Sequence, residues 1–166
     1  MISEKNNRFR SKEQISSDVA SVLNAELTWG TQFAVLSEAI WVWSEFEGKF
    51  KGCVHWTPGA WKSRADRKLL THEHVVPKSV IIEHLAQMRG RATGAEVKRV
   101  LDEFCIGVVV LRSEDRLLTS AKLRSAMPPE WSGKSPWARY EVIGLTVVKH
   151  PETEHESVVF PKRRGR

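Results

Sequence analysis

The residues best suited to chemistry in this sequence are His72, Glu73 and His74, which open the hexapeptide HEHVVP. Imidazoles and carboxylates are the side chains that carry protons near neutral pH and bind divalent metals. Successive side chains of a β-strand point to opposite faces, so His72 and His74 should share one face and Glu73 the other. Pro77 has no N–H for a ladder hydrogen bond and should end the strand. The pattern predicts a divalent-metal or general-base site at a strand end.

The elements that must position this hexapeptide are indicated by hydrophobic periodicity and capping residues. In chain order we expect helices at 12–26 and 31–47, a basic connection at 48–68, a strand at 68–76, helices at 79–88 and 94–104, a strand at 106–111, a helix from 113, a loop at 126–136, and a hairpin of 145–149 with 157–160. Gly30 should separate the first two helices, and Thr31 should cap the second. The helix capped by Ser113 should bury Leu117, Leu118 and Ala121.

The composition describes a single globular domain. The chain has 166 residues, of which 41% are hydrophobic and 28% charged, a balance that excludes a disordered chain. We expect one domain over residues 1–166, with flexible tails at 1–10 and 161–166. No apolar run is long enough to span a bilayer and the first residues lack a signal-peptide core, so we expect a cytoplasmic protein with no membrane partner. Cys53 and Cys105 are expected to be reduced thiols.

Charge and tryptophan content bear on partners. The formal net charge of +6 favours a polyanionic partner, which would be DNA or RNA. Of the two, we expect DNA. Four tryptophans, Trp41, Trp43, Trp56 and Trp61, crowd one region. They fit three roles, namely core anchors, base-stacking platforms, or an interface for a protein partner or a second copy forming a homodimer.

Residues 73–77, with the sequence EHVVP, resemble the opening motif of HNH endonucleases, the ββα-metal family, in which an acidic residue or His precedes the catalytic His and a Pro follows. The run IGVVVL at 106–111 and the helix from Ser113 resemble the second strand and the metal-bearing helix of that unit. The resemblance covers residues 69–119, with two helices inserted. It implies an α+β fold in which N-terminal helices pack on a ββα-metal-like unit with a short C-terminal hairpin.

The resemblance implies a metal-dependent endonuclease that hydrolyses phosphodiester bonds in nucleic acid. His74 would be the catalytic base, since a neutral imidazole suits proton removal near pH 7. Glu73 and Asp115 would bind Mg²⁺ or Mn²⁺ through oxygen, with Glu114 and His72 as further candidate ligands. The residues expected to bind phosphates are Arg64, Arg67, Lys78, Arg112 and Arg116.

Two alternatives remain open from the sequence. Every Asn precedes the motif and Thr119 stands where the family places a second His, so the scaffold could be a catalytically degenerate module that binds nucleic acid or protein. Alternatively, Cys53, His55, His72 and His74 have the two-residue spacing with which two neighbouring strands could bind Zn²⁺.

Overall fold

The computed structural model describes residues 11–46, 49–50, 53–149 and 157–158. The tails expected at 1–10 and 161–166 lie outside these residues. The helices are α1 (Lys12–Asn24), α2 (Trp29–Ser44), α3 (Pro58–Lys62), the 3₁₀ helix η2 (Arg67–Leu69), α4 (Lys78–Ala86), α5 (Gly94–Phe104), α6 (Arg112–Ser120) and α7 (Ala138–Ile143). The strands are β1 (His55–Trp56), β2 (Leu70–His74), β3 (Gly107–Leu111), β4 (Val147–Lys149) and β5 (Ser157–Val158). Within the described residues, none of these helices has the length and apolar character that crossing a membrane requires.

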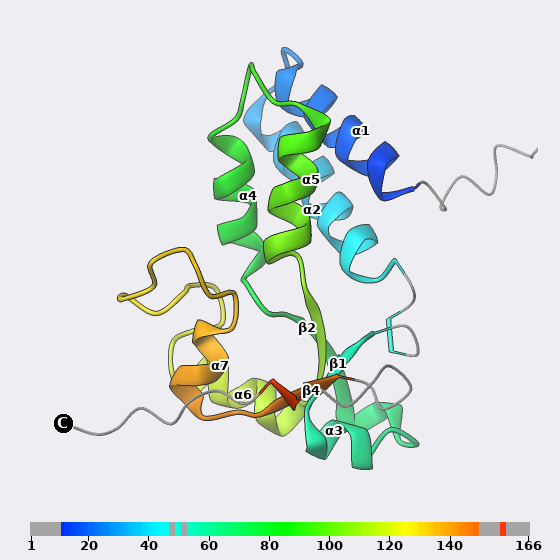
Figure 1. The fold of residues 1–166 in the computed structure, drawn as a ribbon, viewed down its shortest axis with the longest axis vertical. Coiled ribbons are helices and arrows are strands. Elements are labelled where there is room, and N and C mark those ends of the chain that lie inside the picture. Colours follow the sequence, from blue (N-terminus) through cyan, green and yellow to red (C-terminus); the bar gives the residue numbers. More distant parts are fainter. Residues whose placement is uncertain (1–10, 47–48, 51–52, 150–156, 159–166) are drawn as a thin grey trace, which may run out of the picture.

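The fold is α+β, with a mixed sheet at one end and a helical layer at the other (Figure 1). The strand order is β2-β3-β1-β4-β5, in which β3 and β1 are parallel and the other neighbours antiparallel. Helices α1, α2, α4 and α5 form the helical layer, whereas α3, α6 and α7 lie around the sheet (Figure 1). The β2–β3 ladder therefore leads from the helical layer into the sheet.

Local sequence accounts for the helical layer. Helices α1 and α5 both begin with a capping box. In this motif the N-cap hydroxyl accepts a hydrogen bond from the main-chain N–H three residues later, and the side chain of that later residue accepts one from the N-cap N–H. In α5 the apolar residues Val97, Leu101 and Phe104 recur at helical spacing and are all buried. Helix α1 packs on α5 and on α2. The predicted helices at 12–26 and 94–104 are thus confirmed, the first ending two residues early.

Three predicted boundaries are wrong. Gly30 does not separate the first two helices but lies inside α2, because Thr28 rather than Thr31 takes the extended N-cap conformation. Strand β2 starts later than expected, since η2 occupies residues 67–69 before it. Ser113 does not cap α6, which begins one residue earlier and uses the side chain of Glu114 for its capping bond.

The burial expected for α6 is also partly wrong. Leu118 is buried, but Leu117 is 46% exposed and Ala121 is exposed. The basic connection at 48–68 contains β1 and α3 in its described part, and the loop expected at 126–136 is followed by α7, a helix that we did not predict. The late hairpin is confirmed for β4 with β5, while residues 159–160 lie outside the described residues.

Candidate functional site

Strand β2 presents its three ionisable residues to two different layers of the fold. His72 and His74 are buried beside Trp41 of α2, whereas Glu73 contacts Arg139 and Tyr140 of α7. The prediction that the two imidazoles share one face and Glu73 takes the other is confirmed. As a result, the predicted base and the predicted acid lie on opposite sides of the strand.

The imidazole of His74 is enclosed by α2. Its Nε2 lies 2.9 Å from the Ser44 hydroxyl oxygen, and its ring centroid is 4.4 Å from that of Trp41. The residue is only 6% exposed. Burial lowers the pKa of His74 to about 3, and the neighbouring His72 and Lys78 lower it further. His74 is therefore neutral at pH 7, but it is packed against protein rather than open to a substrate.

His72 lies in the same layer and is 5% exposed. Both of its ring nitrogens lack a hydrogen-bond partner among the described residues, and Glu45 Oε1 is 3.9 Å from Nδ1. Burial lowers the pKa of His72 to about 4, and the charge of Lys49 adds to this. Gly107 of β3 makes room for this ring, because a Cβ there would lie 2.7 Å from Cε1 of His72.

Glu73 is held by two donors from α7. Its Oε2 accepts from Arg139 Nη2 at 2.8 Å and from the Tyr140 hydroxyl at 3.1 Å. Burial raises the pKa of Glu73 to about 7, and the charge of Asp115 acts in the same direction, while Arg139 and the Tyr140 hydrogen bond oppose the rise. The carboxyl of the motif is thus bound internally and desolvated.

The guanidinium of Arg139 is fully buried among oxygen atoms from two segments, residues 73–75 and residues 123–124. It donates to Glu73 Oε2 and to the main-chain oxygens of His74, Val75, Leu123 and Arg124. We call this set of five oxygens the oxygen cage. A permanent cation already neutralises the acid of the motif there.

Glu114, a further predicted metal ligand, is engaged in other contacts. Glu114 Oε2 accepts from the main-chain N–H of Leu111 at 2.8 Å and from the Thr57 hydroxyl at 2.6 Å, which makes it a helix cap. Asp115 is half-buried on α6 and His72 faces α2. Among the residues that the structure describes, no three His, Cys, Asp or Glu side chains gather in a way that could bind a metal. Glu114 is thus a helix cap and His72 lies on the other face of β2 from Glu73, while a Mg²⁺ or Mn²⁺ site at Glu73 and Asp115 stays a prediction.

The zinc alternative fails on sheet order. Strand β3 lies between β1 and β2, so His55 is not on a neighbouring strand of His72 and His74. The Cys53 thiol donates to the His55 carbonyl at 3.4 Å, and the His55 ring packs edge-on against Trp137 at 5.1 Å between centroids. Burial raises the pKa of Cys53 to about 11, which disfavours the thiolate that zinc requires.

The predicted phosphate-binding residues fall into two places. Arg67 of η2 and Arg112 and Arg116 of α6 are exposed, and Arg64 is also exposed although its guanidinium carbon lies 4.5 Å from the Trp61 ring centroid. Helix α3 is joined to the start of α6 by the Thr57–Glu114 hydrogen bond. We define the basic surface as the exposed cations of these adjoining elements: Lys62, Arg64, Arg67, Lys68, Arg112 and Arg116. Lys78 is separate, because it lies at the start of α4 with its amine 5.8 Å from the Trp41 ring.

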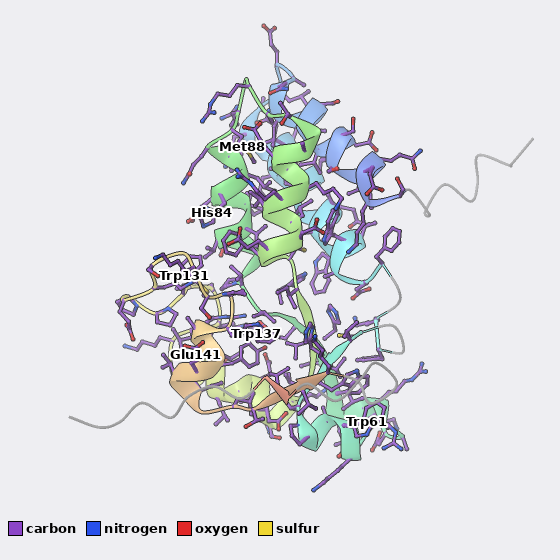
Figure 2. The ribbon with its side chains drawn as sticks, viewed as in Figure 1. Trp61, His84, Met88, Trp131, Trp137 and Glu141 are labelled. Carbon is purple, nitrogen blue, oxygen red and sulfur yellow. The ribbon has the colours of Figure 1, made fainter. Side chains whose placement is uncertain are left out.

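Two of the four tryptophans singled out from the sequence are core anchors. Trp43 and Trp56 are each 3% exposed and belong to two different buried clusters. Trp61 packs edge-on against Trp56 near α3, whereas Trp137 lies beside α7 (Figure 2). Because these tryptophan side chains lie in separate places, they do not form one stacking platform.

Sequence reasoning missed Arg139 and Tyr140, the two residues that bind Glu73. A weak signal was present, because Tyr140 and Ile143 have helical spacing and Gly144 follows at φ 67°, a left-handed conformation that ends helices. No pattern in that segment indicated a buried arginine. No protein-family model, curated protein or solved structure matches this chain.

Proposed function

We propose that this protein is a nucleic-acid-binding module on an HNH-like scaffold, in which the motif that would cleave phosphodiesters serves to hold the fold together. The observation that carries the proposal is the placement of the motif. Its acid, Glu73, and its base, His74, are bound in separate buried networks on opposite faces of β2. The basic surface, by contrast, is exposed.

The order and pairing of three elements support the scaffold. Strand β2 pairs antiparallel with β3, and α6 follows β3 directly and contacts both strands. Helices α4 and α5 occupy the connection between the two strands and pack into the helical layer. This order of strand, strand and helix, with helices between the two strands, supports the unit that the resemblance of residues 69–119 implies.

Hydrolysis would need His74 and Glu73 to be open to water and to a metal ion. A general base must reach the attacking water at hydrogen-bond distance, and a ligand of a divalent cation must offer free oxygen to it. The Nε2 of His74 lies at that distance from Ser44, and Glu73 Oε2 already accepts two hydrogen bonds. Binding without cleavage therefore fits the described contacts better than metal-dependent cleavage.

The basic surface supplies the chemistry for a polyanion. Lysine and arginine side chains that neutralise phosphates release condensed counterions, so affinity should fall with salt by about 0.9 logarithmic units per decade for each phosphate neutralised on duplex DNA. Arg67 and Arg112 are suited to this role because both are exposed, and because η2 leads into Leu70 while α6 follows Leu111, its partner in the β2–β3 ladder. The net charge of +6 favours the same class of partner.

The proposal is tested by fluorescence anisotropy with labelled single- and double-stranded DNA and RNA, at salt concentrations from about 50 to about 200 mM. Replacing Arg67 and Arg112 with Ala together should weaken binding and reduce the salt slope by about 1 for each phosphate that is no longer neutralised. A matched control replaces Arg91 and Arg99 with Ala, since both are exposed at the helical end of the molecule. The control should bind as the unmodified protein does.

The same preparations are incubated with supercoiled plasmid in Mg²⁺ or Mn²⁺. We expect intact plasmid. Cutting that is lost in Glu73→Gln but retained in Arg99→Ala would establish the endonuclease instead and reject our proposal. Equal, salt-insensitive affinity for the two double variants would reject the basic surface as the binding site.

A further inference from the structure

We infer that the guanidinium of Arg139 is a built-in cation, which occupies the position beside the β2 acid where the HNH resemblance implies a divalent metal. The inference concerns how this chain neutralises Glu73. It does not depend on whether the basic surface binds nucleic acid.

The oxygen cage matches the guanidinium bond for bond. Arginine has five N–H donors in a planar fork. Here Nε donates to Val75 O at 3.0 Å, Nη1 to Leu123 O at 2.7 Å and Arg124 O at 3.4 Å, and Nη2 to Glu73 Oε2 at 2.8 Å and to His74 O. Every donor thus has an oxygen acceptor, although the side chain is fully buried.

The oxygen atoms of the cage are also of the kind that bind a hard metal cation. Carboxylate and main-chain carbonyl oxygens are the ligands that Mg²⁺, Mn²⁺ and Ca²⁺ prefer. They come from the end of β2 and from the turn that follows α6, and the cation itself comes from α7. Arg139 therefore links three segments that are distant in sequence, as a structural metal would.

Charge balance disfavours a metal in addition to Arg139. The guanidinium neutralises Glu73, which is 15% exposed, and the Tyr140 hydroxyl donates to the same Oε2. A divalent ion bound to this carboxylate would lie close to a buried permanent cation, where repulsion is poorly screened. Mg²⁺ and Mn²⁺ should consequently leave the folded protein unaffected at this position.

Removing the guanidinium should turn the cage into a site for an added cation. We compare thermal unfolding of the full chain, Arg139→Ala, and the double variant Arg139→Ala/Glu73→Gln in methylguanidinium, Mg²⁺, Mn²⁺ or Ca²⁺ chloride, each matched in ionic strength with NaCl. Arg139→Ala should lower the melting temperature by about 10 °C, the scale expected when one partner of a buried ion pair is lost. Methylguanidinium or a divalent ion should restore several degrees in Arg139→Ala but not in the double variant.

Arg124→Ala is the matched control, because its carbonyl accepts a bond in the cage while its side chain is exposed. It should melt near the unmodified protein and gain nothing from any cation. Failure of every cation to stabilise Arg139→Ala beyond this control would overturn the inference.

A second measurement needs only folded, unmodified protein and decides the matter if Arg139→Ala does not fold. Equilibrium dialysis against Mn²⁺ should show no stoichiometric uptake by the full chain. One Mn²⁺ per chain that is lost in Glu73→Gln would place a metal at the acid and refute the role given to Arg139.

Discussion

Mild acid should destabilise this protein through the two buried imidazoles, and the size of the effect can be worked out from their surroundings. The pKa of His72 is lowered to about 4 and that of His74 to about 3, in both cases mainly by burial. The unfolded chain returns each imidazole to its ordinary value of about 6.5. Because the unfolded state then binds more protons, the stability that the neutral rings contribute is complete above about pH 6.5 and is lost as the pH falls toward 4.

The linkage relation gives the magnitude. Between pH 7 and pH 5 the unfolded imidazoles become almost fully charged, while the folded ones stay neutral, so His72 and His74 each remove about 2 kcal/mol from the free energy of unfolding. Glu73 acts in the opposite direction, because its pKa is raised to about 7 and the folded state takes up its proton first. That carboxyl adds about 2 kcal/mol on the same acidification. The unmodified protein should therefore lose only about 2 kcal/mol net from these three groups.

Variants separate the opposing contributions. Urea unfolding is followed by tryptophan fluorescence at pH 7 and pH 5 for the unmodified chain, His74→Gln and Glu73→Gln. The stability gap between the unmodified chain and His74→Gln should shrink by about 2 kcal/mol at pH 5, because the variant no longer has this imidazole to protonate. The difference in free energy of unfolding between the unmodified chain and Glu73→Gln should grow by a similar amount, because only the unmodified chain gains stability from protonation of Glu73. A His74→Gln gap that is constant within about 0.5 kcal/mol would show that the imidazole is accessible to water, and would restore it as a candidate base.

Two further substitutions test the packing on either side of the sheet. Gly107→Ala should cost about 1–3 kcal/mol in urea unfolding, because the added methyl would lie 2.7 Å from Cε1 of His72; unchanged stability would mean that β3 and this ring are not in contact. Glu114→Ala should cost about 1–3 kcal/mol, since it removes a helix cap and leaves the buried Thr57 hydroxyl without its acceptor. Glu103→Ala, exposed on α5, should stay within about 0.5 kcal/mol and so controls for loss of a carboxylate.

Features set by neighbouring residues could be predicted from the sequence. The capping box of Thr93 with Glu96 fixed the start of α5, and the alternation along β2 placed Glu73 opposite the imidazoles. Predictions were wrong where two nearby residues could play the same structural role. Thr28 and Thr31 are both competent caps, and a glycine within the first turn does not stop a helix. Leu117 and Leu118, being adjacent, point about 100° apart on a helix, and on α6 only Leu118 is turned into the core.

The candidate site was less predictable because its contacts are remote in sequence. The Arg139 bonds to Glu73 and Val75 span 66 and 64 residues. Nothing in the segment around Arg139 distinguishes an arginine that will be buried from the many that remain exposed, because the oxygens that compensate its charge come from other elements. For the same reason the motif itself could suggest a metal, but it could not reveal that the chain supplies a cation of its own.

The two buried networks give a physical reason for three ionisable residues in a strand that lies between two layers. Slipping β2 by one residue would turn Glu73 toward Trp41 and the imidazoles toward α7, because side chains alternate between faces. Arg139 would then be buried without its carboxylate, and Ser44 would lose its imidazole partner. An apolar strand would suffer no such penalty on slipping, whereas here each wrong register leaves a buried charge or donor unpaired. The side chains of His72, Glu73 and His74 thus specify one register of β2, and this register holds α2 against one face of the strand and α7 against the other.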